Sequence, residues 1–206
     1  MDSTSHMQTD YFMLMGDSLN QWTTREGPPP EKRLRGISWQ QRPVFVAAPI
    51  KLRTSTGGLP KEPFPAYEGS CEPLLSAKAK SLLEPLAISH LQFLPADVSF
   101  ESGEVKRLWW LHVYRSIHCV DRKRTKGLFA SPRQMMAIGK LVLDEQALAD
   151  IPLERRLIFR LGELLDIILL HSSLVERLRS WEAEGLKFMR VDEWHHADFI
   201  EDYRGP

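Results

Sequence analysis

The stretch that decides the fold is residues 74–94, LLSAKAKSLLEPLAISHLQFL. Over residues 74–86 the apolar side chains recur at the spacing that places them on one face of a helix. Ser76 stands where an N-cap would, because its hydroxyl can accept a hydrogen bond from a free amide of the first turn. The run Leu91-Gln92-Phe93-Leu94 then predicts a strand. A helix followed by a strand is therefore the first expected unit.

The same order returns 95 residues further along, in residues 169–189, LLHSSLVERLRSWEAEGLKFM. Both stretches read as an apolar run, an amphipathic helix, a turn and a strand that contains Leu-x-Phe. A duplicated helix–strand module is one interpretation, and chance similarity between two helix–turn–strand units is the other. The gapless shift pairs Leu74 with Leu169, Leu75 with Leu170, Ser76 with His171, Ala79 with Leu174, Leu83 with Leu178, Leu86 with Trp181, Leu91 with Leu186, Phe93 with Phe188 and Asp97 with Asp192.

Further apolar runs predict an α+β (mixed α/β) fold, with an antiparallel-rich sheet and packed helices. Residues 167–170 fit a strand or a helix, and residues 140–144 end at a turn or a helix start. Prolines and glycines predict a loop at 27–30 and a mostly long loop over 49–73, a candidate binding surface. The remaining predicted strands are residues 11–15, 44–48, 108–113 (extended or paired by 117–120), 157–161 and 186–189.

The composition is that of an ordinary folded chain. With 206 residues, 43% of them hydrophobic, it can bury a sizeable core. Residues 1–7 look like the remnant of an expression tag, with Met7 the expected natural start. Residues 8–206 are then expected to form a single globular domain, with two lobes at about 8–100 and about 101–206.

Several classes of protein are disfavoured by what the chain lacks. Cys71 and Cys119 are its two cysteines, too few for a disulfide framework or a four-cysteine zinc site, which favours a reducing, cytoplasmic location. No apolar run reaches the roughly 18–20 residues of a membrane helix, and no secretory signal opens the chain. A formal net charge of 0 argues against a general nucleic-acid binder. No glycine-rich phosphate loop is present, so no cofactor is expected.

The zero net charge hides a polarised chain. Residues 101–140 hold nine lysines and arginines against three acidic residues, whereas residues 141–206 hold eight against fourteen. Such a bipolar distribution suits electrostatic steering of a charged protein partner. The alternative is that the two regions neutralise each other within the fold or are simply solvated.

The densest polar cluster is Asp192-Glu193-Trp194-His195-His196-Ala197-Asp198 near the end of the chain. Carboxylates and imidazoles can ligate a divalent cation, but adjacent histidines lack the i, i+4 helical spacing that directs two ligands at one ion. We predict no metal site and interpret the segment as an acidic, partner-facing surface able to cap a basic groove. A solvated acidic surface is the alternative. The predicted partner-binding residues are Asp192, Glu193, Asp198, Glu201 and Asp202.

No catalytic residue is predicted elsewhere. His118 and Cys119 are neighbours on a predicted strand, so their side chains point to opposite faces and cannot easily form a nucleophile pair. By the same alternation, Trp109 and Trp110 face opposite sides, and burial of both is the preferred interpretation. The basic run Arg122–Lys126 leaves open a weak nucleic-acid-binding module.

An ordered series of short elements resembles one family of bacterial polymorphic-toxin immunity proteins, group eleven of that classification. The similarity covers roughly residues 72–191, and two elements depart from the pattern: His118 replaces an Asp, and Leu170-His171-Ser172 replaces Leu-Val-Ser. The matching elements are Leu74-Leu75-Ser76, Trp109-Trp110-Leu111-His112-Val113, His118-Cys119-Val120-Asp121-Arg122, Lys140-Leu141-Val142-Leu143-Asp144, Ile158-Phe159-Arg160-Leu161 and Gly185-Leu186-Lys187-Phe188.

This resemblance implies a function. Members are encoded beside secreted toxins, often delivered by type VI secretion, and protect the producing cell by binding the toxin domain. It implies a cytoplasmic, non-enzymatic immunity protein that blocks the active site of a cognate toxin, commonly a nuclease of the His-Asn-His class, and contacts neither membrane nor nucleic acid. A small metal-dependent hydrolase that uses the Asp192–His196 cluster is the alternative, followed by the nucleic-acid-binding module.

Overall fold

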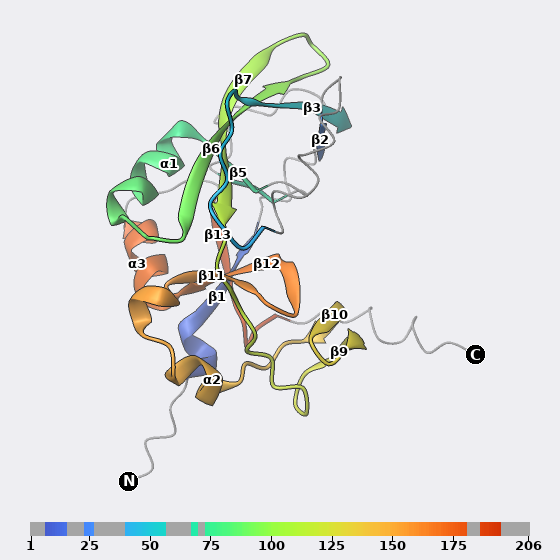
Figure 1. The fold of residues 1–206 in the computed structure, drawn as a ribbon, viewed down its shortest axis with the longest axis vertical. Helices are drawn as coiled ribbons and strands as arrows, with labels where there is room; N and C mark the ends of the chain where they lie inside the picture. Colours follow the sequence, from blue (N-terminus) through green and yellow to red (C-terminus); the bar gives the residue numbers. More distant parts are fainter. Residues whose placement is uncertain are drawn as a thin grey trace, which may run out of the picture. The chain divides into compact units, whose positions relative to one another are not determined.

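The computed structural model describes residues 7–15, 23–26, 40–56, 67–69, 73–180 and 186–194 (Figure 1). The chain divides into two compact units. The first comprises residues 1–14, 116–176 and 188–206, and the second comprises residues 15–115 and 177–187. Both units combine strands with short helices, so the predicted α+β class is confirmed. The predicted loop at 27–30 lies outside the described residues.

A six-stranded mixed sheet organises the second unit, in the order β2-β3-β6-β7-β5-β4. Its centre is the antiparallel hairpin of β6 and β7, which pair over their whole length from Leu91 opposite Val113 to Ser99 opposite Val105. Strand β3 joins β6 in parallel. The strands are β2 (Thr23–Glu26), β3 (Ile50–Thr56), β4 (Tyr67–Gly69), β5 (Pro73–Leu75), β6 (Leu91–Ser99) and β7 (Val105–Val113).

The predicted N-cap at Ser76 is confirmed. Its side chain accepts a hydrogen bond from the Ala79 amide at 3.1 Å and starts α1 (Ala77–Leu83), which continues into the 3-10 helix η3 (Glu84–Leu86). The predicted helix is wrong at its first residues. Leu74 and Leu75 belong to β5, because they pair with Trp110 and Trp109 of β7. The extended backbone of β5 buries both leucines before the helix begins.

The strand predicted at residues 44–48 is wrong, and strands interrupt the loop predicted after it. Residues 44–48 form no strand, because the Gln92 side chain takes the place of a neighbouring strand and bonds both the amide and the carbonyl of Val44. The loop predicted over residues 49–73 is interrupted by β3 and β4, and its residues 57–66 and 70–72 lie outside the described residues. The alternating side chains of β3 place Ile50 and Leu52 in a core with Val98 and Trp110.

A five-stranded sheet organises the first unit, in the order β13-β1-β12-β11-β8. Strand β12 lies between β1 and β11 and is antiparallel to both. Residues 117–120 therefore do not extend β7 as predicted: β8 pairs in parallel with β11. Residues 167–170 adopt the strand alternative. The strands are β1 (Tyr11–Met15), β8 (Ser116–Ile117), β11 (Ile158–Leu161), β12 (Leu164–His171) and β13 (Lys187–Arg190).

The first unit also contains a separate hairpin of β9 (Lys126–Ser131) and β10 (Gln134–Lys140), which the sequence did not predict. Short helices complete it: η1 (Met7–Asp10), α2 (Glu145–Ala149), which Asp144 caps, and η4 (Leu153–Arg155). Helix α3 (Ser172–Ser180) contains the boundary between the two units.

Buried aromatic side chains hold the five-stranded sheet together. The Tyr11 and Phe159 rings meet edge to face, with centroids 5.6 Å apart, and both residues are fully buried. The Tyr11 hydroxyl accepts a hydrogen bond from the Arg156 guanidinium at 2.6 Å. Burial raises the pKa of Tyr11. The phenol therefore stays neutral and satisfied inside the sheet.

The two similar stretches of sequence adopt the same order of elements. Each runs strand, helix, strand: β5-α1-β6 in one and β12-α3-β13 in the other. In each sheet one further strand lies between the two strands of the stretch: β7 between β5 and β6, and β1 between β12 and β13. The aligned pairs Leu74/Leu169, Leu75/Leu170, Ala79/Leu174 and Leu83/Leu178 are all buried.

The two helices also begin alike. His171, which aligns with Ser76, precedes α3, and its Nδ1 accepts a hydrogen bond from the Ser173 amide at 3.2 Å. Burial lowers the pKa of His171 and so favours the neutral ring. The Ser173 amide can donate only to the tautomer whose Nδ1 carries no proton. The second stretch has histidine where the first has serine, and a side chain caps the start of the helix in both.

An ion-pair triad joins three adjacent strands of the six-stranded sheet. Lys51 on β3 and Arg107 on β7 both lie opposite Asp97 on β6. Their side chains donate to its two carboxylate oxygens at 2.6 and 2.5 Å. The hydrogen bond from Arg107, then that from Lys51, lowers the pKa of Asp97.

Because the Asp97 pKa is lower in the folded chain, its stabilising contribution is present above the ordinary aspartate value and is lost as the pH falls below about 4. We expect Asp97→Asn to lower the free energy of unfolding at neutral pH by roughly 1 kcal/mol. The gap from the wild type should shrink towards zero at about pH 2.5. Urea titrations at both pH values measure this difference in the free energy of unfolding. Asp166→Asn, at an exposed position on β12, is the control. A gap that is constant with pH would contradict the triad.

Candidate protein-binding surface

The described part of the predicted acidic surface is Asp192 and Glu193, in the turn that follows β13. The turn is anchored by Val191, a buried residue whose amide donates to the Tyr11 carbonyl on β1 at 3.0 Å. This backbone hydrogen bond fixes where the acidic segment leaves the sheet. Asp198, Glu201 and Asp202 lie outside the described residues, as do His195 and His196 of the alternative metal cluster.

Arg190 on β13 pairs with the first of these carboxylates. Its Nε and Nη2 donate to the two oxygens of Asp192 at 2.9 and 2.5 Å, and its Nε lies 3.6 Å from Glu193 Oε1. The hydrogen bond with the Asp192 carboxylate raises the pKa of Arg190. Side-chain exposure is 61% for Glu193 and 30% for Asp192. Glu193 is therefore the better placed of the two to contact a partner.

The basic run opens on a turn ordered by Asp121. One oxygen of its carboxylate accepts from the Lys123 and Arg124 amides at 3.0 and 3.1 Å, and the other accepts from Arg124 Nε at 2.6 Å. The bond from Arg124 lowers the pKa of Asp121. Arg122, the first cation of the run, lies over the Phe129 ring of β9, 4.7 Å from the ring centroid. The turn thus presents cations in fixed positions at the start of the β9–β10 hairpin.

His118 and Cys119 lie after the end of β8 and not on the predicted strand, and they differ in burial: His118 is exposed and Cys119 is buried. No sequence pattern indicated their neighbour Glu163, in the turn between β11 and β12. Its Oε1 accepts from the Val120 amide at 3.2 Å and lies 3.7 Å from His118 Nδ1. This turn also brings Gly162 so close that a Cβ there would lie 2.8 Å from the His118 ring.

The Cys119 thiol is the opposite of an activated nucleophile. Burial, then the negative charges of Glu163 and Asp144, raises its pKa well above the ordinary value. A nucleophilic cysteine needs a lowered pKa and access to solvent. Cys119 therefore serves as a small apolar side chain within the first unit.

Both tryptophans are covered, one more deeply than the other. Trp110 is buried in the core, whereas Trp109 is half-buried beneath the Lys80 ammonium group, which lies 4.5 Å from its ring. Lys80 also pairs with Glu84 at 2.5 Å. The alternation predicted for the strand is confirmed. The predicted burial is correct for Trp110 and wrong for Trp109, which is only half-buried.

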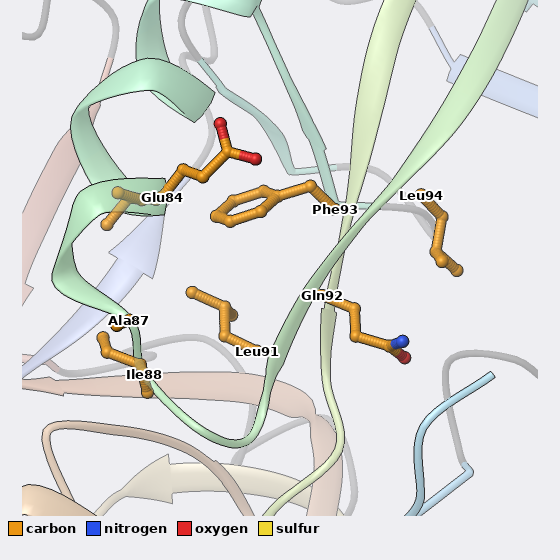
Figure 2. Close-up of a pocket in the computed structure, with 8 residues that line it drawn as sticks. Glu84, Ala87, Ile88, Leu91, Gln92, Phe93 and Leu94 are labelled. Atoms are coloured by element: carbon orange, nitrogen blue, oxygen red, sulfur yellow. The ribbon is translucent and has the colours of Figure 1, made fainter. Parts of the chain in front are cut away.

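A shallow cavity of about 310 Å³ lies beside this ion pair, between η3 and β6 (Figure 2). Leu91 and Phe93 point towards η3, whereas the Gln92 side chain points away, as expected for alternating residues of a strand. Small-molecule sites combine apolar walls with several converging polar groups. Here the one ionisable group in the lining, Glu84, is already paired with Lys80.

Across the described ranges, no three or more His, Cys, Asp or Glu side chains gather where they could hold a metal ion. In the same ranges, no helix has the length and apolar character needed to cross a bilayer.

Surface segments with one sign of charge can steer and hold a charged macromolecular partner. Comparison with protein families identifies the class: the model of the immunity protein family Imm11 matches residues 3–193. The chain therefore belongs to the immunity protein family Imm11. The match includes the N-terminal third, which the short motifs did not cover. A search of curated proteins found no match to the chain.

The environment of Cys119 predicts its reactivity. In the variant Cys71→Ser, where Cys119 is the remaining thiol, iodoacetamide at about pH 8 should modify the folded protein at least about 100-fold more slowly than the unfolded protein. Mass spectrometry of timed samples measures both rates. Similar rates in the two states would show that the thiol is accessible and contradict this assignment.

Proposed function

We propose that this protein is a cytoplasmic immunity protein that binds one cognate toxin tightly and blocks its active site. The toxin would be a nuclease encoded by the neighbouring gene and delivered by type VI secretion. The observation that carries the proposal is the match to the immunity protein family Imm11 over residues 3–193. In this proposal the chain acts by stoichiometric binding and none of its residues is catalytic.

The acidic segment that begins at Asp192 is the proposed contact with the substrate groove of the toxin. A nuclease groove is basic because it binds phosphates, so carboxylates can occupy it in place of the substrate. The hydrogen bond between Val191 and Tyr11 fixes the start of the segment on the sheet. Fixing one end of the segment lowers the conformational entropy lost on binding. The proposed contact residues are Asp192, Glu193, Asp198, Glu201 and Asp202.

Co-expression tests the function. Cells that express the toxin from the neighbouring gene should lose viability, and this chain should restore it. The two purified proteins should then elute as one stoichiometric complex in size-exclusion chromatography. Because binding is the whole mechanism, protection should require at least as much of this chain as of toxin. Failure to restore viability, with both proteins present, would contradict the proposal.

The acidic contact is tested in the same system. Asp192→Asn with Glu193→Gln removes two charges from the segment, and we expect the dissociation constant of the complex to rise about tenfold. Asp166→Asn with Glu176→Gln removes two exposed carboxylates elsewhere and is the matched control. An equal effect of both pairs would argue against a specific acidic contact.

A further inference from the structure

The hairpin of β9 and β10 has a buried side and a solvent side. Across it, Gly127 lies opposite Ile138 and Phe129 opposite Met135, and Met135 and Ile138 are buried. The intervening pairs point the other way. The solvent side, which we call the hairpin face, therefore consists of Lys126 with Lys140, Leu128 with Ala137, and the exposed Met136.

Two lysines face each other across this hairpin. Lys126 and Lys140 are direct cross-strand partners, and both are exposed. Like charges directly opposite on neighbouring strands destabilise a hairpin. Among the described residues, no carboxylate lies within ion-pair distance of either lysine. The pair thus works against the fold and is explained better by a partner that brings negative charge.

Met136 supplies an apolar group beside these cations. The register of the hairpin shifts between Met135 and Ala137, so Met136 is the extra residue of a bulge. It is 70% exposed. Bulges redirect a side chain, and methionine is enriched at protein interfaces. An apolar residue with a charged rim is the usual anatomy of such an interface.

The turn before β9 adds further cations to the same element. Residues 116–143 contain six lysines and arginines and one carboxylate, Asp121. That carboxylate is already bonded to Arg124. Arg122 is held over Phe129, and this placement covers the ring that a nucleic-acid base would need for stacking. The surface thus favours an acidic protein over a nucleic acid.

We propose that the hairpin face docks onto an acidic surface of the toxin. This inference rests on the proposed function and adds a second contact, of opposite charge to the acidic segment. The exposed Met136 would lie at the centre of the contact, with the lysines pairing with carboxylates of the partner around it.

The test separates folding from binding. Lys140→Glu places opposite charges across the hairpin, so its thermal midpoint should stay the same or rise. Its association rate constant with the purified toxin should fall, by about tenfold when Lys126→Glu is added. The control is Lys78→Glu with Arg155→Glu, two exposed cations outside the hairpin, which makes the same change in net charge. Biolayer interferometry measures the rates.

Three outcomes overturn the inference. Hairpin variants that associate within about twofold of the control variant would show that the hairpin lies outside the interface. No binding by the wild-type chain would overturn the proposed function and this inference with it. A short fluorescent DNA duplex that binds the wild type and not the hairpin variants, while toxin binding is unchanged, would assign the surface to nucleic acid.

Discussion

Two pairs of consecutive leucines are buried on both faces of their strands. In each case this burial requires that the helix which follows the strand pack against its sheet. Leu74 and Leu75 on β5, and Leu169 and Leu170 on β12, each have almost no exposed surface. Consecutive residues of a strand point to opposite faces, so each pair requires cover on both sides of its sheet. A helix that starts at once after the strand can supply one cover, and a side-chain cap starts α1 and α3 alike.

One capped helix and several buried strands were predictable from local patterns. Ser76 showed where α1 starts, and apolar runs marked β1, β11 and β13. The β9–β10 hairpin was missed because register shifts interrupt its alternation. In addition Gly127 has no side chain, and a Cβ there would lie 2.5 Å from the Ala137 carbonyl oxygen. Strand β3 was missed because the prolines and glycines around it dominated its neighbourhood. The false strand at 44–48 has strand composition, but the Gln92 side chain bonds the backbone amide and carbonyl of Val44.

The sequence predicted which segments of the candidate surface are charged, but not how their side chains pair or where they lie. The sequence showed that acidic residues gather from Asp192 onwards and that basic residues gather before Lys140. It did not show that Arg190 pairs with Asp192, or that Glu163 reaches Val120 from a distant turn. Some charged side chains form ion pairs within the chain: Asp97 with Arg107, and Asp121 with Arg124. The lysines of the hairpin face have no such partner among the described residues.

Membership of the immunity protein family Imm11 implies that the chain binds a cognate toxin, and the proposed contacts assign these charges to steering and holding that toxin. Buried apolar residues form the scaffold, and the charged segments lie at its turns and on its hairpin. The most direct test is the association rate of the protein with its toxin as sodium chloride rises from about 50 mM to about 500 mM. Docking guided by these charges predicts a steep fall, on the order of tenfold or more. A rate that does not change with salt would contradict it.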